Sequence, residues 1–258
     1  MKTNSVPKIR FKGFTDDWEQ RKLGEIVERV TRKNQSLQSQ LPLTISAQFG
    51  LIDQNEFFDK RIASKDVSGY YLIKNGEFAY NKSTSVDAPW GAIKRLDRYE
   101  MGVLSTLYIV FRIRDSIKTN SDYIVTYYDT NIWHKEVKAI AAEGARNHGL
   151  LNITPSDFFE TVIALPKDFE EQQKIGEYFS NLDNLITLHQ RKCEQTKELK
   201  KFMLQKMFPK KGEKNPEIRF PGFTDDWEQR KLGEIAEFNP KSDLPDEFEY
   251  VDLESVVG

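Results

Sequence analysis

The stretch IRFKGFTDDWEQRKLGEI at Ile9–Ile26 recurs as IRFPGFTDDWEQRKLGEI at Ile218–Ile235. The copies differ at one position, which is Lys12 in the first and Pro221 in the second. They lie too far apart for a solenoid, whose repeats have periods of roughly 20 to 50 residues. The spacing indicates a duplicated domain, with one copy at the start of each unit. The second unit stops after only about forty residues, which are too few to bury a core.

The composition limits what the rest of the chain can be. Of 258 residues, 38% are hydrophobic and 30% charged, so we expect one folded core with an appendage. No apolar run approaches the roughly 18 residues of a membrane helix, and no signal peptide is recognisable. The sequence therefore predicts a cytoplasmic protein without a membrane partner. Cys193 is the single cysteine and there are three histidines, so we expect neither a disulfide nor a metal site.

The net charge of −2 hides an uneven distribution. Residues 1–166 carry 23 basic against 20 acidic residues, and residues 167–211 carry 10 against 7. Residues 212–258 carry 5 against 13, so an acidic tail masks two mildly basic segments. An excess this small permits DNA binding without demanding it.

The region between the copies shows strand patterns. LYIVFRI at residues 107–113 alternates, so we expect one buried face, formed by Leu107, Ile109, Phe111 and Ile113. GEFAYN follows the turn signal Asn75-Gly76 and predicts a second strand. TVIALP predicts a third strand, which Pro166 ends.

A helical pattern lies between these strands. Residues Asn120–Ala141 predict one helix, for which Ser121 is the expected N-cap. Strands and a helix in one region indicate an α+β fold, with a globular mixed domain over residues 1–166.

The residues from Asp168 to Phe208 predict one long helix. They are strong helix formers without proline, and Gly176 is the only internal break. About forty residues span roughly 60 Å at 1.5 Å per residue, so we expect a projecting spacer. The chain thus divides into a domain at 1–166, a helix at 167–211, and a linker with the incomplete start of a second domain at 212–258.

One face of this helix has the spacing of a coiled-coil seam. Positions four and three residues apart form it: Ile175, Phe179, Leu182, Ile186, His189, Cys193, Thr196, Lys200, Met203 and Met207. Such a seam needs a partner helix. The expected partner or dimer interface consists of its apolar members Ile175, Phe179, Leu182, Ile186, Met203 and Met207.

Four strings, taken in order with the repeat, carry a family resemblance. They are WEQRKLGEI in each copy, GVLSTLYIVFR at residues 102–112, GARNHGLLNI at residues 144–153, and IALPKDFEEQQKIGEYFSNLDNLI, which enters the helix. The chain resembles the specificity subunit of type I restriction-modification enzymes over essentially its whole length.

The resemblance implies a division of labour between subunits. Each target recognition domain of that family reads one half of a split DNA sequence, and helices set the distance between the halves. The subunit has no catalytic residues and no cofactor. A partner methyltransferase subunit binds S-adenosylmethionine and methylates adenine N6, and a restriction subunit driven by ATP cleaves DNA.

The chain departs from the family by stopping inside its second recognition domain. A domain that reads one half-site needs a second copy to read the other. We therefore hypothesise that two copies associate through residues 175–207 and read a symmetric split site.

Two segments offer side chains suited to DNA readout. Arginine and lysine contact phosphates and guanine, asparagine contacts adenine, and hydroxyl groups contact either base class. One segment is NKSTS at residues 81–85, with Arg95 and Arg98 beyond it, and the other is RNH at residues 146–148 between two glycines, which permit close backbone approach. The predicted DNA contacts are Lys82, Ser83, Arg95, Arg146, Asn147 and His148.

Ordinary structural roles compete with these. NKSTS is equally well explained as a solvated turn. For Arg95 and Arg98, exposed salt-bridge partners are the favoured interpretation. For residues 146–148, DNA contact is favoured over a polar connection, because glycines flank three side chains able to contact bases. For Trp18 and Trp227, core packing is favoured over base stacking.

Two other function classes compete with a DNA-reading subunit. A coiled-coil adaptor that binds only proteins explains the helix but leaves the GARNHG loop without a role. An autonomous nuclease or methyltransferase would need motifs that the sequence lacks, namely a phosphate-binding loop, a G-x-G-x-x-G string or an Asn-Pro-Pro-aromatic motif. The DNA-reading subunit is therefore favoured.

Overall fold

The computed structural model describes residues 7–46, 49–60, 62–86, 88–141 and 149–237. The chain forms two compact units, Met1–Thr187 and Leu188–Gly258. Within the described residues, no helix combines the length and apolar character needed to span a membrane.

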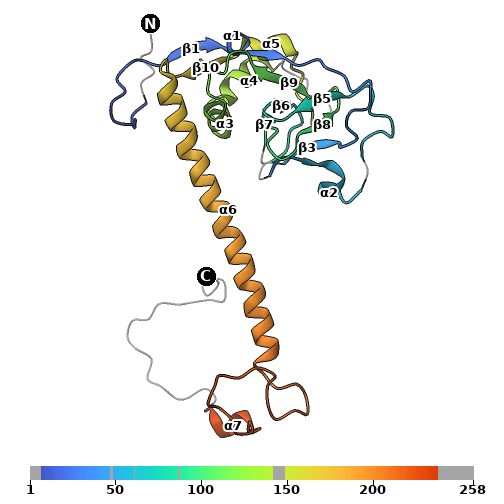
Figure 1. Ribbon diagram of the computed structural model, residues 1–258, viewed down its shortest axis with the longest axis vertical. Coiled ribbons are helices and arrows are strands. Elements are labelled where there is room, and N and C mark those ends of the chain that lie inside the picture. Colours follow the sequence, from blue (N-terminus) through green and yellow to red (C-terminus); the bar gives the residue numbers. More distant parts are fainter. Residues whose placement is uncertain (1–6, 47–48, 61, 87, 142–148, 238–258) are drawn as a thin grey trace. The chain divides into compact units, whose positions relative to one another are not determined.

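A four-stranded antiparallel sheet organises the first unit (Figure 1). Its order is β2 (Val27–Arg29), β9 (Ile109–Ile113), β6 (Phe78–Asn81) and β7 (Ala92–Arg95). Three antiparallel pairs accompany it: β1 (Glu19–Lys22) with β10 (Val162–Leu165), β3 (Leu43–Ser46) with β4 (Gly50–Asp53), and β5 (Tyr71–Lys74) with β8 (Met101–Leu104). The shorter helices are α1 (Leu23–Ile26), α2 (Gln54–Phe58), α3 (Ser121–Asp129), α4 (His134–Ile140), α5 (Pro155–Glu160) and α7 (Leu232–Ile235). Helices with antiparallel sheets confirm the α+β class, and β6 and β10 confirm two predicted strands.

The sheet is buried on both faces, which corrects one expectation. Phe111 of β9 belongs to one apolar cluster with Tyr80, and Val110 belongs to a second cluster with Ala79. Both Val110 and Phe111 are buried, whereas Leu107 precedes β9 and is 53% exposed. The strand was predicted to have one buried face. Because apolar side chains cover the sheet from two sides, alternation along the strand does not report its burial.

The predicted helix over residues 120–141 is two helices. Its expected N-cap was also wrong, because Asn120 caps α3 and its side chain accepts a hydrogen bond from the Tyr123 N–H at 2.9 Å. The helix ends at Asp129 because Trp133 turns into the core, where its indole N–H donates to the Tyr128 carbonyl at 3.0 Å. A buried indole that satisfies a carbonyl near the helix end favours the break over a continuous helix.

The predicted long helix is confirmed as α6 (Phe169–Lys206), a single helix of 38 residues (Figure 1). Its first turns belong to the first unit, where Glu171 and Gln172 are buried. A Cβ added to Gly176 would lie 2.7 Å from the Asp122 Cβ and 2.8 Å from the Tyr123 nitrogen. The one glycine in the helix therefore permits the close approach of α3.

Candidate functional site

Two segments that the sequence separates by more than sixty residues lie side by side. The Thr84 N–H donates to the Gly149 carbonyl at 2.6 Å, and the Leu151 N–H donates to the Lys82 carbonyl at 3.0 Å. Ser83 and Leu150 form an antiparallel bridge between these bonds. Residues 82–84 of NKSTS are thus joined to residues 149–151, which follow the predicted RNH segment. Arg146, Asn147 and His148 themselves lie outside the described residues.

Lys82 and Ser83 are positioned by backbone contacts. The Lys82 ammonium donates to the Ile153 carbonyl at 3.2 Å, and partial burial lowers the pKa of Lys82 below its ordinary value. The Ser83 N–H donates to the Asn81 Oδ1 at 3.0 Å, which closes a local turn after β6. The Asn81 amide and the Ser83 hydroxyl group therefore lie close together at the end of the buried strand β6.

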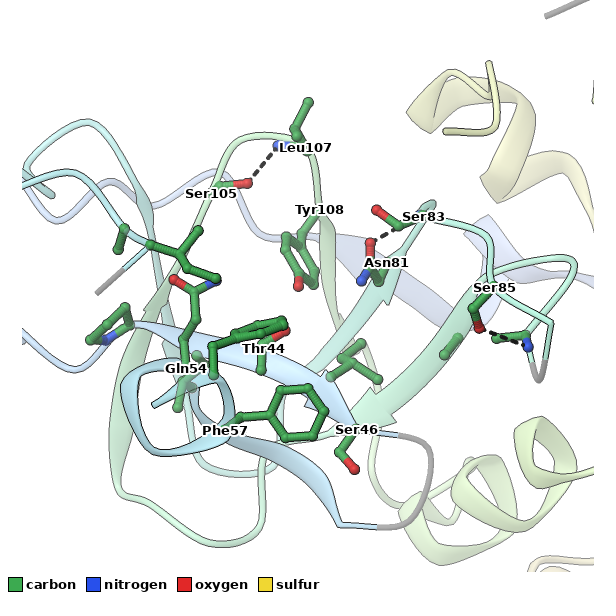
Figure 2. A pocket seen from close by; sticks show the side chains of 18 of the residues that line it. Thr44, Ser46, Gln54, Phe57, Asn81, Ser83, Ser85, Ser105, Leu107 and Tyr108 are labelled. Carbon is green, nitrogen blue, oxygen red and sulfur yellow. Dashed lines mark hydrogen bonds between the residues drawn. The ribbon is translucent and has the colours of Figure 1, made fainter. Parts of the chain in front are cut away.

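Ser83 lines a cavity of about 760 Å³. Figure 2 shows Thr44 of β3 with Gln54 and Phe57 of α2 on one side, and the residues that follow β6 on the other. The polar side chains around it are Thr44, Ser46, Gln54, Asn81, Ser83, Thr84, Ser85 and Ser105. No lysine, arginine, aspartate or glutamate is among the described residues that line it. The lining can form hydrogen bonds without attracting phosphate by charge.

Sequence reasoning missed the β3 and α2 side of this cavity. Thr44, Ser46 and Gln54 lie far from residues 81–85 in sequence, and only the fold brings them together. The available signal was weak: hydroxyl residues alternate with apolar ones in LTIS, and Ser46 ends the strand. Thr44 and Ser46 are buried, whereas Gln54 is half-buried and its amide group suits contacts to base edges. Gln54 therefore joins the predicted residues.

Arg95 lies apart from this site and is engaged elsewhere. The β6–β7 register pairs Arg95 with Phe78, whereas Asn81 at the other end of β6 pairs with Ala92. The Arg95 Nε contacts Asp97 at 2.6 Å, and its Nη1 contacts Asp122 at 2.8 Å. Its side chain is only 18% exposed. This geometry favours the salt-bridge alternative, since Arg95 ties β7 to the first turn of α3.

The predicted partner interface on α6 divides into three parts. Ile175 packs against the core of its own domain and is therefore engaged there. Phe179, Leu182 and Ile186 are exposed at 46%, 37% and 54%. Met203 is half-buried, and the half-buried Met207 lines a second cavity with residues of the repeat's second copy.

The repeat tryptophans have different surroundings. Trp18 is half-buried, packs against the core, and lies edge-on to Tyr123 with ring centroids 6.0 Å apart. Trp227 is 42% exposed and lies edge-on to Phe208 at 5.9 Å. The predicted packing role thus agrees with the environment of the first copy.

No curated protein matches the chain in sequence. The type I restriction-modification S subunit from M. genitalium matches in structure with a TM-score of 0.52 at 13% identity, over 79% of this chain and 48% of that chain. The HsdS subunit from Thermoanaerobacter tengcongensis gives 0.46 at 19% identity, over 77% and 51%. A chain solved in work on complex assembly and conformational transition of the type I R-M system gives 0.47 at 17% identity, over 77% and 51%. The chain thus spans about half the length of these solved structures.

The structural match to the M. genitalium S subunit supports a shared fold. The family of the chain follows from its sequence. Residues 15–198 match the family described as type I restriction modification DNA specificity domain. The match includes the sheet-containing domain and most of α6, which is more than half of the chain. The chain therefore belongs to the type I restriction-modification DNA specificity domain family.

Proposed function

We propose that this chain is a non-catalytic subunit that reads DNA sequence for a type I restriction-modification complex. It would position a methyltransferase subunit and a restriction subunit on a split target in double-stranded DNA. The observation that carries the proposal is the family match over residues 15–198. The S-adenosylmethionine would be bound by the methyltransferase partner and not by this chain.

The DNA-contacting surface that we propose comprises residues 81–85, the paired residues 149–151 and the polar rim of the cavity. Its uncharged hydroxyl and amide groups suit base selection, which depends on hydrogen bonds at base edges. Lys82 supplies a cation beside them, although part of its side chain is buried. Arg146, Asn147 and His148 directly precede Gly149 in sequence and remain predicted contacts.

Self-association through α6 completes the proposal. Phe179, Leu182 and Ile186 are large apolar side chains exposed along one stretch of the helix. Exposed apolar residues at coiled-coil spacing favour a partner helix. Two copies would then present two recognition domains to a symmetric split site.

DNA titrations at several salt concentrations test the reading role. We expect affinity to fall with salt, because phosphate contacts release counterions. Lys82→Ala should weaken binding to all sequences and reduce the salt slope by about 1, whereas Arg146→Ala should cost roughly 1 to 3 kcal/mol and relax base preference at one position. Lys118→Ala is the matched control, because its side chain is 82% exposed. Absence of any salt-dependent affinity would favour the protein-binding adaptor instead.

The assembly is tested separately. The chain and its methyltransferase should together methylate adenines at one symmetric split site, and the chain alone with S-adenosylmethionine should methylate none. Sedimentation should show dimers that Leu182→Glu disrupts, because a charge would enter the apolar seam. A monomer both alone and with the methyltransferase would refute the self-association.

A further inference from the structure

The first repeat copy, Ile9–Ile26, is attached to its own domain by side chains at its start. The Arg10 guanidinium binds the Glu171 carboxylate through two hydrogen bonds of 2.6 and 2.7 Å. Glu171 is only 1% exposed, and the Trp18 indole N–H also points to it at 3.4 Å. Phe11 lies edge-on to Tyr178 of α6 at 5.8 Å. A buried carboxylate thus receives its cation from a segment far away in sequence.

The end of the first copy is attached by a strand and by apolar burial. Strand β1 pairs with β10 in the register Gln20–Ala164, and the Leu23 N–H donates to the Thr161 carbonyl at 2.8 Å. Leu23 and Ile26 are 0% and 5% exposed. We call the surface that receives this segment the repeat-docking site; it consists of β10, Thr161, α5 and the first turns of α6.

The second copy has the same side chains without such burial. Leu232 and Ile235 are 59% and 63% exposed. Phe220 and Phe223 are each 67% exposed. Within the described residues, no strand pairs with residues 228–231. The segment therefore presents an unpaired backbone edge and four large apolar side chains to solvent.

We propose that residues 218–235 bind the repeat-docking site of a second copy of this chain, in place of that copy's residues 9–26. The first copy, seated on the site, shows the contacts that the second would make. Arg219, Trp227 and Leu232 stand where the first copy has Arg10, Trp18 and Leu23. The one difference between the copies falls at Lys12, which is exposed. Every side chain that the site buries is thus duplicated.

Residues 9–26 of each chain, the resident segment, compete with any incoming copy of the repeat for the docking site. Because the resident segment is attached to its site by a short connection, its effective concentration is high. Replacement of residues 9–26 by residues 218–235 of another copy should therefore increase with protein concentration. It should also increase when a substitution weakens the contacts of residues 9–26.

Disulfide trapping between two different chains tests this docking. Both chains carry Cys193→Ser. The acceptor, which supplies the docking site, also carries Ala164→Cys and Leu23→Ala. The donor, which supplies residues 218–235, carries Gln229→Cys. Gln229 corresponds to Gln20, which is exposed and opposite Ala164, so the two thiols would lie within disulfide range. We expect at least fivefold more disulfide-linked dimer than with a donor that carries Lys214→Cys instead. This excess should disappear when the Gln229→Cys donor also carries Leu232→Asp.

Two results would overturn the proposal. Equal trapping with the Lys214→Cys donor would show random collision, and trapping that survives Leu232→Asp would show that the apolar contacts are not used. Should the Leu23→Ala acceptor not fold, a peptide of residues 215–237 with Gln229→Cys replaces the donor, against an acceptor that keeps Leu23. That peptide should be trapped at Ala164→Cys several times faster than a scrambled peptide, and equal rates would reject the docking.

Discussion

The two repeat copies have nearly the same sequence and very different surroundings. Both form the same turn at their glycine, with φ of 106° at Gly13 and 93° at Gly222, and both form a short helix from LGEI. Only the first copy forms a strand from EQRK, because only there does β10 stand beside it. Since the two sequences are nearly identical, the turn and the short helix are local conformations, whereas the strand needs a partner strand.

The largest expected difference between the copies concerns their buried leucine. Leu23→Ala should lower the free energy of unfolding by about 2 to 5 kcal/mol, because a fully buried leucine leaves a cavity. Leu232→Ala should change it by less than about 0.5 kcal/mol, because that side chain is 59% exposed. Urea denaturation at low micromolar protein concentration measures both. Equal losses would contradict the difference in burial.

The tryptophans should show a smaller contrast in the same direction. Trp18→Ala should cost about 1 to 3 kcal/mol, because the half-buried indole packs on the core and on Tyr123. Trp227→Ala should cost less than about 1 kcal/mol, since the ring is 42% exposed. Thermal unfolding followed by circular dichroism gives the ranking. A larger loss for Trp227 than for Trp18 would reverse the assignment.

A charge difference beside the repeat should appear in a pH titration. Lys8 precedes the first copy, and Glu217, which precedes the second, binds Lys206 and Lys210. These cations lower the pKa of Glu217 from 4.5 to about 2. The pairing should therefore stabilise the second unit above about pH 4.5 and be lost as the pH falls toward 2.

Carboxyl chemical shifts in NMR spectra measure that pKa. The control variant Lys206→Gln with Lys210→Gln removes both cations and should return the Glu217 pKa toward 4.5. An unchanged pKa in the control would show that the lysines are not the cause.

The smallest expected difference concerns the glycine of LGEI. A Cβ at Gly233 would meet no atom within 4 Å, so Gly233→Ala should stabilise α7 by up to about 1 kcal/mol. At Gly24 the new Cβ would lie 3.2 Å from the Phe159 carbonyl oxygen, so Gly24→Ala should gain less. Amide hydrogen exchange over residues 23–26 and 232–235 compares them. A greater gain at Gly24 would show that Phe159 moves freely.

The sequence predicted much of the fold because helix and turn signals are local. Residues 168–208 predicted α6 from helix formers alone, and Asn75-Gly76 preceded β6 as expected. The break before α4 was missed because it depends on Trp133 reaching a core built from distant segments. Burial of both faces of β9 was missed for the same reason.

The candidate site was harder to predict than the fold. The sequence indicated Lys82 and Ser83 by residue type, and the fold joined them to residues 149–151 through the hydrogen bonds of Thr84 and Lys82. It also placed Thr44 and Gln54 around the same cavity. Arg95 has a suitable residue type, but it pairs with its near neighbour Asp97 and, through the packing of α3 on β7, with Asp122. Residue type limits what chemistry is available, and packing decides where it is available.

The two repeat copies separate local conformation from conformation that depends on packing. The glycine turn and the LGEI helix follow from the sequence alone, because their backbone conformations depend on neighbours within a few residues. The strand at residues 19–22 and the burial of Leu23 depend instead on contacts with segments far away in the chain. A strand satisfies its hydrogen bonds on another segment, and a leucine leaves water only where other side chains enclose it.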